Sequence, residues 1–411
     1  MNSHANNRHL AIPDSGCQKQ GGYGDSEQRA DITLLQPVPI FADAKKPPAP
    51  AIIAKPSSLT KATSTAAPYD KSITVRQLLK QSGLQEFLDM PGVTDVRVNQ
   101  PGTVIVETSA GWKAFPKPQC DLRVLRELAN AAVIYSGSGG AIDKTSPVKS
   151  VRLPDGQRGQ ISVPPACQPD TVAMVFRIAS GQRFSIDNYV DSGRLQKFAD
   201  VAVFKDVPAD VHLAEHELEL LAAKNAKDMK RFFQLCIKHK LNICIAGGTG
   251  SGKTTFMKAL ADLVGPNVCI ITIEDTHELD LPLHWNKVHL FYVDGVVTAK
   301  EQLKNCMRMK PDRIFLTELR GNEAFDYIAA LNTGHPGSLT TVHADNAKGA
   351  LKRIATLLKG SESGGSLDWA HLMREVTGSI DVVAQFVNTH MTELYFDPVR
   401  KEKMLRGDRD V

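Results

Sequence analysis

Apolar and polar positions change their spacing along the chain, and each spacing predicts a kind of secondary structure. Val75 to Leu88 carries apolar residues at helical intervals and is followed by the breaker "PG", so we expect a helix. "TDVRVN" and "TVIVET" alternate apolar and polar residues around "QPG", which predicts a hairpin. "DLRVLRELANAAVIYS" predicts a second helix, "KSVRLPDGQRGQISVPPA" a hairpin that turns at "PDG", and "TVAMVFRIAS" a strand. Together these elements predict an α+β domain.

The second half of the chain alternates apolar strands with amphipathic helices. "LNICIAGG", "NVCIITIED", "RIFLTEL", "GSLTTVHAD" and "SIDVVAQFV" read as strands, and segments such as "TAKEQLKNCMRM" and "NEAFDYIAALNTG" read as helices between them. This alternation is typical of a parallel sheet that is covered by helices. We therefore expect an α/β fold with a smaller N-terminal α+β domain.

The patterns divide the 411 residues into four parts. Residues 1–68 combine low apolar density with Pro, Ala, Ser and Lys, which predicts a disordered N-terminal tail. Residues 69–180 form the α+β domain. Residues 181–228 are polar and weakly patterned, which indicates a linker with short helices. Residues 229–411 form the α/β domain.

The amino-acid composition of the chain limits the classes of function that it can have. Lysine and arginine number 49 against 45 acidic residues, a balance too slight to indicate nucleic-acid binding, so we expect no sequence-specific nucleic-acid partner. The 7 cysteines are scattered and odd in number, which argues against a disulfide framework and favours a reducing cytosol. No apolar run is long enough for a membrane-spanning helix, and no secretion signal is evident. Contact with a membrane surface stays open.

The stretch "IAGGTGSGKTT" carries the strongest chemical signal. It matches G-x-x-x-x-G-K-[ST] between an apolar strand and the helix-forming "FMKALADLV", which predicts a phosphate-binding P-loop. Glycines let the backbone aim N–H groups at a phosphate, and the helix adds its positive N-terminal end. Lysine reaches the β- and γ-phosphates of ATP, while the threonine hydroxyl ligates Mg²⁺. The residues that we expect to bind nucleotide are Gly247, Gly248, Thr249, Gly250, Ser251, Gly252, Lys253, Thr254 and Thr255.

A nucleotide site also needs carboxylates, and two strand ends supply them. "VCIITIEDTHEL" ends with Glu274 and Asp275, and "RIFLTELRG" ends with Glu318. In a parallel sheet these ends lie at the same edge as the P-loop. His343 follows the strand in "GSLTTVHAD" and is a weaker candidate. Together with His335 it lacks the spacing of a zinc site.

These motifs resemble a known family. "GGTGSGKTT", "TIEDTHEL", "MKPDRIFLTELRG" and "TGHPGSLTTVHAD" follow the order and approximate spacing of the secretion "traffic" ATPases. The resemblance is closest to the type IV secretion and conjugation ATPases and covers about residues 75–400. It implies a homo-hexameric ring in which each subunit holds ATP between a smaller N-terminal domain and a RecA-like C-terminal domain.

The resemblance also implies roles for individual residues. Glu274 and Asp275, with Thr254, would hold Mg²⁺ and water, and Glu318 matches the Walker B glutamate. Which of the two glutamates polarises the water stays open. His343 matches the second histidine of the histidine box, where it would sense the γ-phosphate.

Two arginines of the N-terminal domain complete this set. Arg158 and Arg177 occupy the strands whose arginines reach the nucleotide in the family. One departure is Thr317, where many relatives have glycine.

The function that the resemblance implies is ATP hydrolysis that powers or gates substrate transfer, or pilus biogenesis, by a bacterial type IV secretion system. Such an enzyme is cytoplasmic, associates peripherally with the inner membrane, and has channel or coupling proteins as partners. A type IV pilus retraction or assembly ATPase, a nucleotide-gated docking scaffold and a DNA-dependent motor stay open as alternatives. The absence of a cysteine-rich zinc insertion counts against the type II branch.

Overall fold

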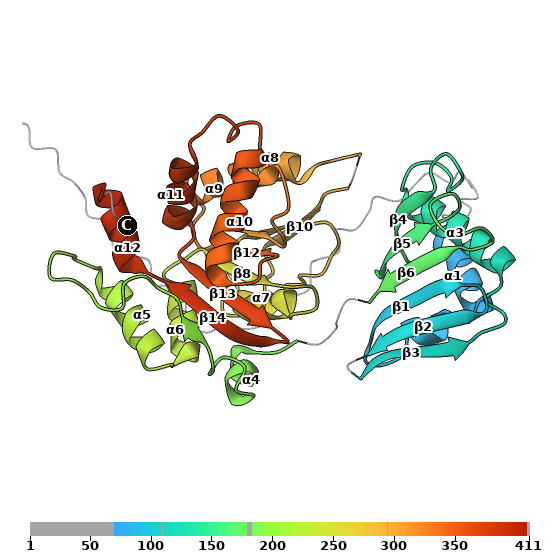
Figure 1. Ribbon diagram of the computed structural model, residues 1–411, viewed down its shortest axis with the longest axis horizontal. Coiled ribbons are helices and arrows are strands. Elements are labelled where there is room, and N and C mark those ends of the chain that lie inside the picture. The colour runs from blue at the N-terminus through green and yellow to red at the C-terminus, as the bar shows by residue number, and fades with distance from the viewer. Residues whose placement is uncertain (1–69, 109, 179–182, 294, 409–411) are drawn as a thin grey trace, which may run out of the picture. The chain divides into compact units, whose positions relative to one another are not determined.

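The computed structural model describes residues 70–108, 110–178, 183–293 and 295–408. The tail expected at residues 1–68 lies outside these ranges. Figure 1 shows a sheet with helices in each half of the described chain, which matches the expected combination of an α+β and an α/β domain. None of the helices in these ranges combines the length and apolar character needed to cross a membrane.

The N-terminal domain is an antiparallel sheet with helices on one face. Within its described residues the strand order is β3-β2-β1-β6-β5-β4. The strands are β1 (Val93–Gln100), β2 (Thr103–Thr108), β3 (Gly111–Pro116), β4 (Val148–Arg152), β5 (Arg158–Ser162) and β6 (Ala173–Arg177). The expected hairpins are confirmed as β1–β2 and β4–β5, whereas β3 has no counterpart among the strands expected from the sequence.

The helix expected from Val75 to Leu88 is divided into two. Helix α1 (Ser72–Gln81) ends before Gly83, which has a φ of +73°, and α2 (Gln85–Leu88) follows as a short turn. A left-handed residue ends an α-helix, and glycine adopts it without steric strain. Helix α3 (Leu122–Ser136) begins at the capping side chain of Asp121, as the pattern predicted. Both longer helices bury their apolar faces against the sheet.

The C-terminal domain contains a larger sheet, most of it parallel. Its strand order among the described residues is β10-β9-β11-β12-β8-β13-β14-β7, and the hairpin β13–β14 is its antiparallel pair. The strands are β7 (Ala199–Asp200), β8 (Ile243–Gly247), β9 (Ile270–Glu274), β10 (Lys287–Phe291), β11 (Arg313–Leu316), β12 (Leu339–Val342), β13 (Val382–Val387) and β14 (His390–Phe396).

Hydrophobic side chains pack on both faces of this sheet. Ile243 and Ile245 of β8 join the cluster that includes Phe232 and Phe256, while Cys244 and Ala246 point to the opposite cluster. This alternation follows from the two-residue period of a strand. The helices that follow α3 are α4 (Ile186–Asp191), α5 (Glu215–Asn225), α6 (Met229–Lys238), α7 (Lys253–Ala261), α8 (Ala299–Arg308), α9 (Glu323–Asn332), α10 (Ala347–Gly360), α11 (Trp369–Ser379) and α12 (Pro398–Arg406).

The segment expected as a linker contributes to the core of the larger domain. Ile186, Tyr189 and Leu220 are buried with the cluster that covers β8, and β7 pairs in parallel with β14. Because these side chains stand among polar residues in the sequence, the apolar pattern did not indicate that they are buried. The larger domain therefore includes much of residues 183–228 as well as the residues that follow.

Candidate active site

The P-loop closes tightly between β8 and α7. A β-carbon at Gly247 would lie 2.4 Å from the carbonyl oxygen of Phe386 and 2.5 Å from Ser251 Oγ, so no larger residue fits. Gly250 and Gly252 have φ values of +74° and +89°, which glycine adopts most readily. The Ser251 hydroxyl donates to the Gly248 carbonyl at 2.9 Å. This is the compact backbone cradle that the sequence predicted for a phosphate group.

Lys253 begins helix α7 and lies inside this cradle. Its ammonium donates to the carbonyl oxygens of Gly247 and Gly248, each at 2.8 Å, and the residue is 8% exposed. Burial lowers the pKa of the ammonium, although the nearby Glu318 carboxylate opposes that shift. Thr249 lies within the loop, and Thr254 and Thr255 occupy the first turn of α7. A hydroxyl at the start of this helix suits Mg²⁺, which prefers oxygen ligands.

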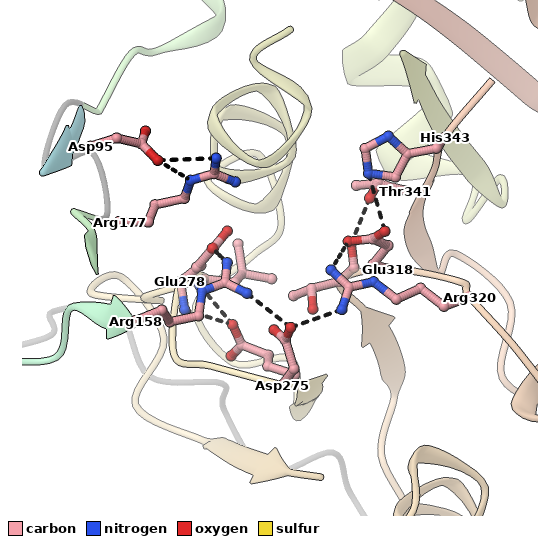
Figure 2. Close-up of polar contacts among 12 residues, drawn as sticks. Asp95, Arg158, Arg177, Asp275, Glu278, Glu318, Arg320, Thr341 and His343 are labelled. Carbon is pink, nitrogen blue, oxygen red and sulfur yellow. Dashed lines mark hydrogen bonds and ion pairs between the residues drawn. The ribbon is translucent and has the colours of Figure 1, made fainter. Parts of the chain in front are cut away.

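Glu318 and His343 come from neighbouring strands and meet beside Lys253. Because β11 and β12 pair in parallel, residues that follow their ends lie close together, and His343 Nε2 is 3.2 Å from Glu318 Oε1 (Figure 2). Burial lowers the pKa of His343, and the positive charge of Lys253 adds to this. Thr317, the departure from the family pattern, is buried and donates its hydroxyl to the Ile273 carbonyl at 3.3 Å.

Arg320 links the acidic groups of the site. Its guanidinium donates to Glu318 at 2.5 Å and to Asp275 at 3.0 Å. Burial acts to raise the pKa of Glu318, but the Arg320 hydrogen bond and the charges of Arg320, His343 and Lys253 outweigh it, so this pKa is lowered. Arg320 belongs to the segment "TELRG", in which the sequence pattern assigned a role only to the glutamate. Its position two residues after a strand-end glutamate was the available signal.

The two arginines expected to reach the nucleotide have different partners. Arg158 donates to Asp275 at 2.8 Å and forms an ion pair with Glu278. Arg177 lies directly opposite Arg158 in the β5–β6 ladder, but its guanidinium donates to Asp95 of β1 at 3.2 and 3.3 Å. Figure 2 shows this difference, with Arg158 beside Asp275 and Arg177 beside Asp95. Arg158 therefore contacts the acidic segment after β9, and Arg177 is paired within its own sheet.

Glu274 lies in a different environment from Glu318. Its side chain is fully buried, and its carboxylate accepts hydrogen bonds from the Thr272 hydroxyl at 2.8 Å and from the backbone N–H groups of Glu278 and Leu279 at 2.8 and 2.9 Å. The strand pattern placed both glutamates at the same sheet edge but did not show where each side chain points. A catalytic or Mg²⁺-binding role for Glu274 stays a prediction.

Comparisons with known proteins agree with the motifs. A family model described as "Type II/IV secretion system protein" matches residues 210–393. The type IV secretion system protein VirB11 of Brucella suis is 37% identical over 336 residues, covering 78% of this chain and 90% of that protein. Protein VirB11 of Agrobacterium fabrum is 33% identical over 322 residues, covering 76% and 89%. The crystal structure of the Brucella suis VirB11 ATPase in complex with sulphate aligns with a TM-score of 0.46 at 36% identity, covering 82% of this chain and 98% of that one.

Proposed function

Because the chain belongs to the family of VirB11 type IV secretion ATPases, we propose that it hydrolyses Mg·ATP to power or gate substrate transfer, or pilus biogenesis, by a bacterial type IV secretion system. It acts as a homo-hexamer in the cytoplasm, associated peripherally with the inner membrane and with channel or coupling proteins. The Brucella suis relative is named as a type IV secretion system protein, which supports the secretion branch over pilus retraction.

The observation that carries the proposal is the grouping of Lys253, Glu318 and His343 around the glycine cradle. Three neighbouring strands, β8, β12 and β11, deliver these side chains to one edge of the sheet. A buried cation that binds the phosphates and an ionised carboxylate that can orient water are groups that phosphoryl transfer uses, and the imidazole lies beside them. The backbone N–H groups of the closed loop supply the surface that binds phosphate.

Each of these residues has a distinct task. Lys253 exchanges the carbonyl oxygens of the loop for the terminal phosphates of ATP, and the gain is large because burial has removed most of its water. Glu318 is ionised at neutral pH, since its pKa is lowered, and so it can orient the attacking water and accept its proton. We expect His343, which lies 3.2 Å from this carboxylate, to contact the γ-phosphate.

Carboxylates hold the arginines of the site before nucleotide binds. Arg158 and Arg320 are paired with three anions among the described side chains. These anions are Asp275, Glu278 and Glu318. A triphosphate adds several negative charges, so it competes with the carboxylates for the arginines. We expect Arg158 to exchange its carboxylate partners for phosphate on ATP binding and to return to them after hydrolysis, a switch of the kind nucleotide motors use.

Lys253→Ala tests the assignment, with Lys348→Ala on the exposed surface of α10 as the matched control. The first variant should lower the steady-state rate of phosphate release by at least about a hundredfold, since it removes the buried cation that stabilises the transferring group. The control should retain the rate of the unaltered chain, and circular dichroism should show that both variants are folded. Unchanged turnover in folded Lys253→Ala would contradict the proposal.

A further inference from the structure

A second group of ligand-type side chains lies at the outer edge of the large sheet. Glu274 ends β9, His289 lies in the neighbouring edge strand β10, and His277 lies in the loop after β9. In the β9–β10 ladder His289 pairs with Thr272, two residues before Glu274, so the side chains of Thr272, Glu274 and His289 lie on one face of the sheet. None of the motifs recognised in the sequence includes the two histidines as ligands.

The distances in this group fit a metal ion. His277 Nδ1 lies 3.5 Å and His289 Nδ1 lies 3.4 Å from the same carboxylate oxygen, Glu274 Oε1. Two ligands of a tetrahedral Zn²⁺ with bonds of about 2.0–2.1 Å are separated by about 3.3–3.4 Å. One ligand atom from each residue lies within 4.8 Å of the other two. Both imidazole–carboxylate separations are longer than the usual hydrogen-bond distance of about 2.7–3.2 Å.

The carboxylate is held in place by groups other than the histidines. The Thr272 hydroxyl lies 2.8 Å from Glu274 Oε1 and 2.8 Å from His289 Nδ1, and two backbone N–H groups donate to Glu274 Oε2. The rings of His277 and His289 pack edge to face, with centroids 4.4 Å apart. In protein metal sites, the side chains that bind the ion are regularly held in position by hydrogen bonds from neighbouring groups. The arrangement thus needs little rearrangement to accept an ion.

We propose that Glu274, His277 and His289 bind a divalent transition-metal ion of the Zn²⁺ type, with water in the fourth position. Two imidazoles and one carboxylate suit Zn²⁺, whereas Mg²⁺ prefers oxygen ligands and octahedral geometry. The side chain of Glu274 is fully buried, and those of His289 and His277 are 19% and 44% exposed, so the ion can enter from the solvent side. The proposal replaces the Mg²⁺-binding role that the family resemblance implies for Glu274, and it does not depend on the proposed ATPase function.

The ion would stabilise the segment after β9, whose acidic side chains bind Arg158 of the N-terminal domain. His277 lies between Asp275 and Glu278, the two partners of Arg158. The backbone N–H groups of Glu278 and Leu279 already anchor this segment to Glu274. A metal bond from His277 would add a further anchor and restrict the motion of both acidic side chains.

The experiment uses the full chain without a histidine tag, stripped of metal by a chelator and kept in excess Mg²⁺ to fill oxygen-ligand sites. Zn²⁺ affinity is measured by competition with a chromophoric chelator, and Co²⁺ absorption reports the ligand geometry. We expect one tight ion per chain and a tetrahedral Co²⁺ spectrum without the charge-transfer band of thiolate ligands. His277→Ala and His289→Ala should each weaken Zn²⁺ binding at least about tenfold, as loss of a ligand does.

His371→Ala, an exposed histidine of α11, serves as the matched control and should bind Zn²⁺ like the unaltered chain. Zn²⁺ should raise the unfolding temperature of the unaltered chain and of the control but not of His277→Ala. His277 is nearly half exposed, so its replacement should leave the metal-free unfolding temperature unchanged. The proposal is refuted if the unaltered chain binds Zn²⁺ no more tightly than the folded His277→Ala variant, or if His371→Ala loses as much affinity.

Discussion

Gly247→Ala should damage both the stability of the protein and its ability to bind nucleotide. The new β-carbon would lie 2.4 Å from the Phe386 carbonyl oxygen, about 1 Å closer than the 3.4 Å at which ordinary contact begins. Phe386 is fully buried, pairs with Gly247 in the β8–β13 ladder and packs against Phe256 at a ring-centroid distance of 4.6 Å. The clash therefore cannot be relieved by a flexible side chain alone.

The expected loss of unfolding free energy is about 3 kcal/mol, the upper end of the range for overpacking a core, because the obstacle includes backbone. A loss of that size lowers the unfolding temperature by roughly 6–12 °C for a domain of this size. Calorimetry measures the unfolding temperature, and the fluorescence of a labelled ATP analogue measures nucleotide affinity. We expect affinity to fall at least about tenfold, because the loop must open to place the methyl group.

Gly248→Ala is the matched control, because a β-carbon at Gly248 meets no atom within 4 Å and the residue needs no positive φ. This variant should keep the unfolding temperature of the unaltered chain. If Gly247→Ala were as stable as Gly248→Ala and bound the ATP analogue equally well, the tight closure of the loop around Lys253 would be refuted.

Glu318→Gln should lower kcat about 10²–10⁴-fold and leave the affinity for ATP unchanged, because it removes the proposed base but not the phosphate contacts. A titration in which ATP affinity falls by as much as kcat would argue against this role. Arg320→Gln removes interactions that lower the pKa of Glu318, so the acid-side fall of a kcat–pH profile should move to higher pH, and an unmoved profile would contradict the assignment. Arg158→Ala should reduce single-turnover hydrolysis by at least about a hundredfold, as loss of one preorganised donor to the transition state does. Arg177→Ala should reduce it less if the Asp95 pairing persists with ATP bound, and equal losses would show that both arginines reach the nucleotide.

Local patterns were sufficient where neighbouring residues determine the structure. The P-loop was predicted because its glycines, lysine and threonine stand together between a strand and a helix, and α7 covers most of the expected "FMKALADLV" but begins earlier, at Lys253. The β1–β2 and β4–β5 hairpins were predicted for the same reason. The edge strand β10 was missed, although "KVHLF" alternates polar and apolar residues, because five residues are too short a pattern to stand out from the surrounding loops.

Side-chain direction at the strand ends could not be obtained from the pattern. Glu274 and Glu318 both follow an apolar strand, yet one is buried with Thr272 and two histidines and the other lies beside Lys253. Arg320 joins the site because the loop after β11 turns its guanidinium towards Asp275, 45 residues away in sequence.

The amino-acid order alone was enough to establish a phosphate-binding loop, an α/β domain and a family, since each depends on contiguous or regularly spaced residues. Strand order, by contrast, depends on which surfaces pack together across the whole chain. It is this packing that sets β12 between β11 and β8, and thereby unites Glu318 and His343 with Lys253. The same packing brings His289 of β10 to Glu274, a contact between residues with no shared motif.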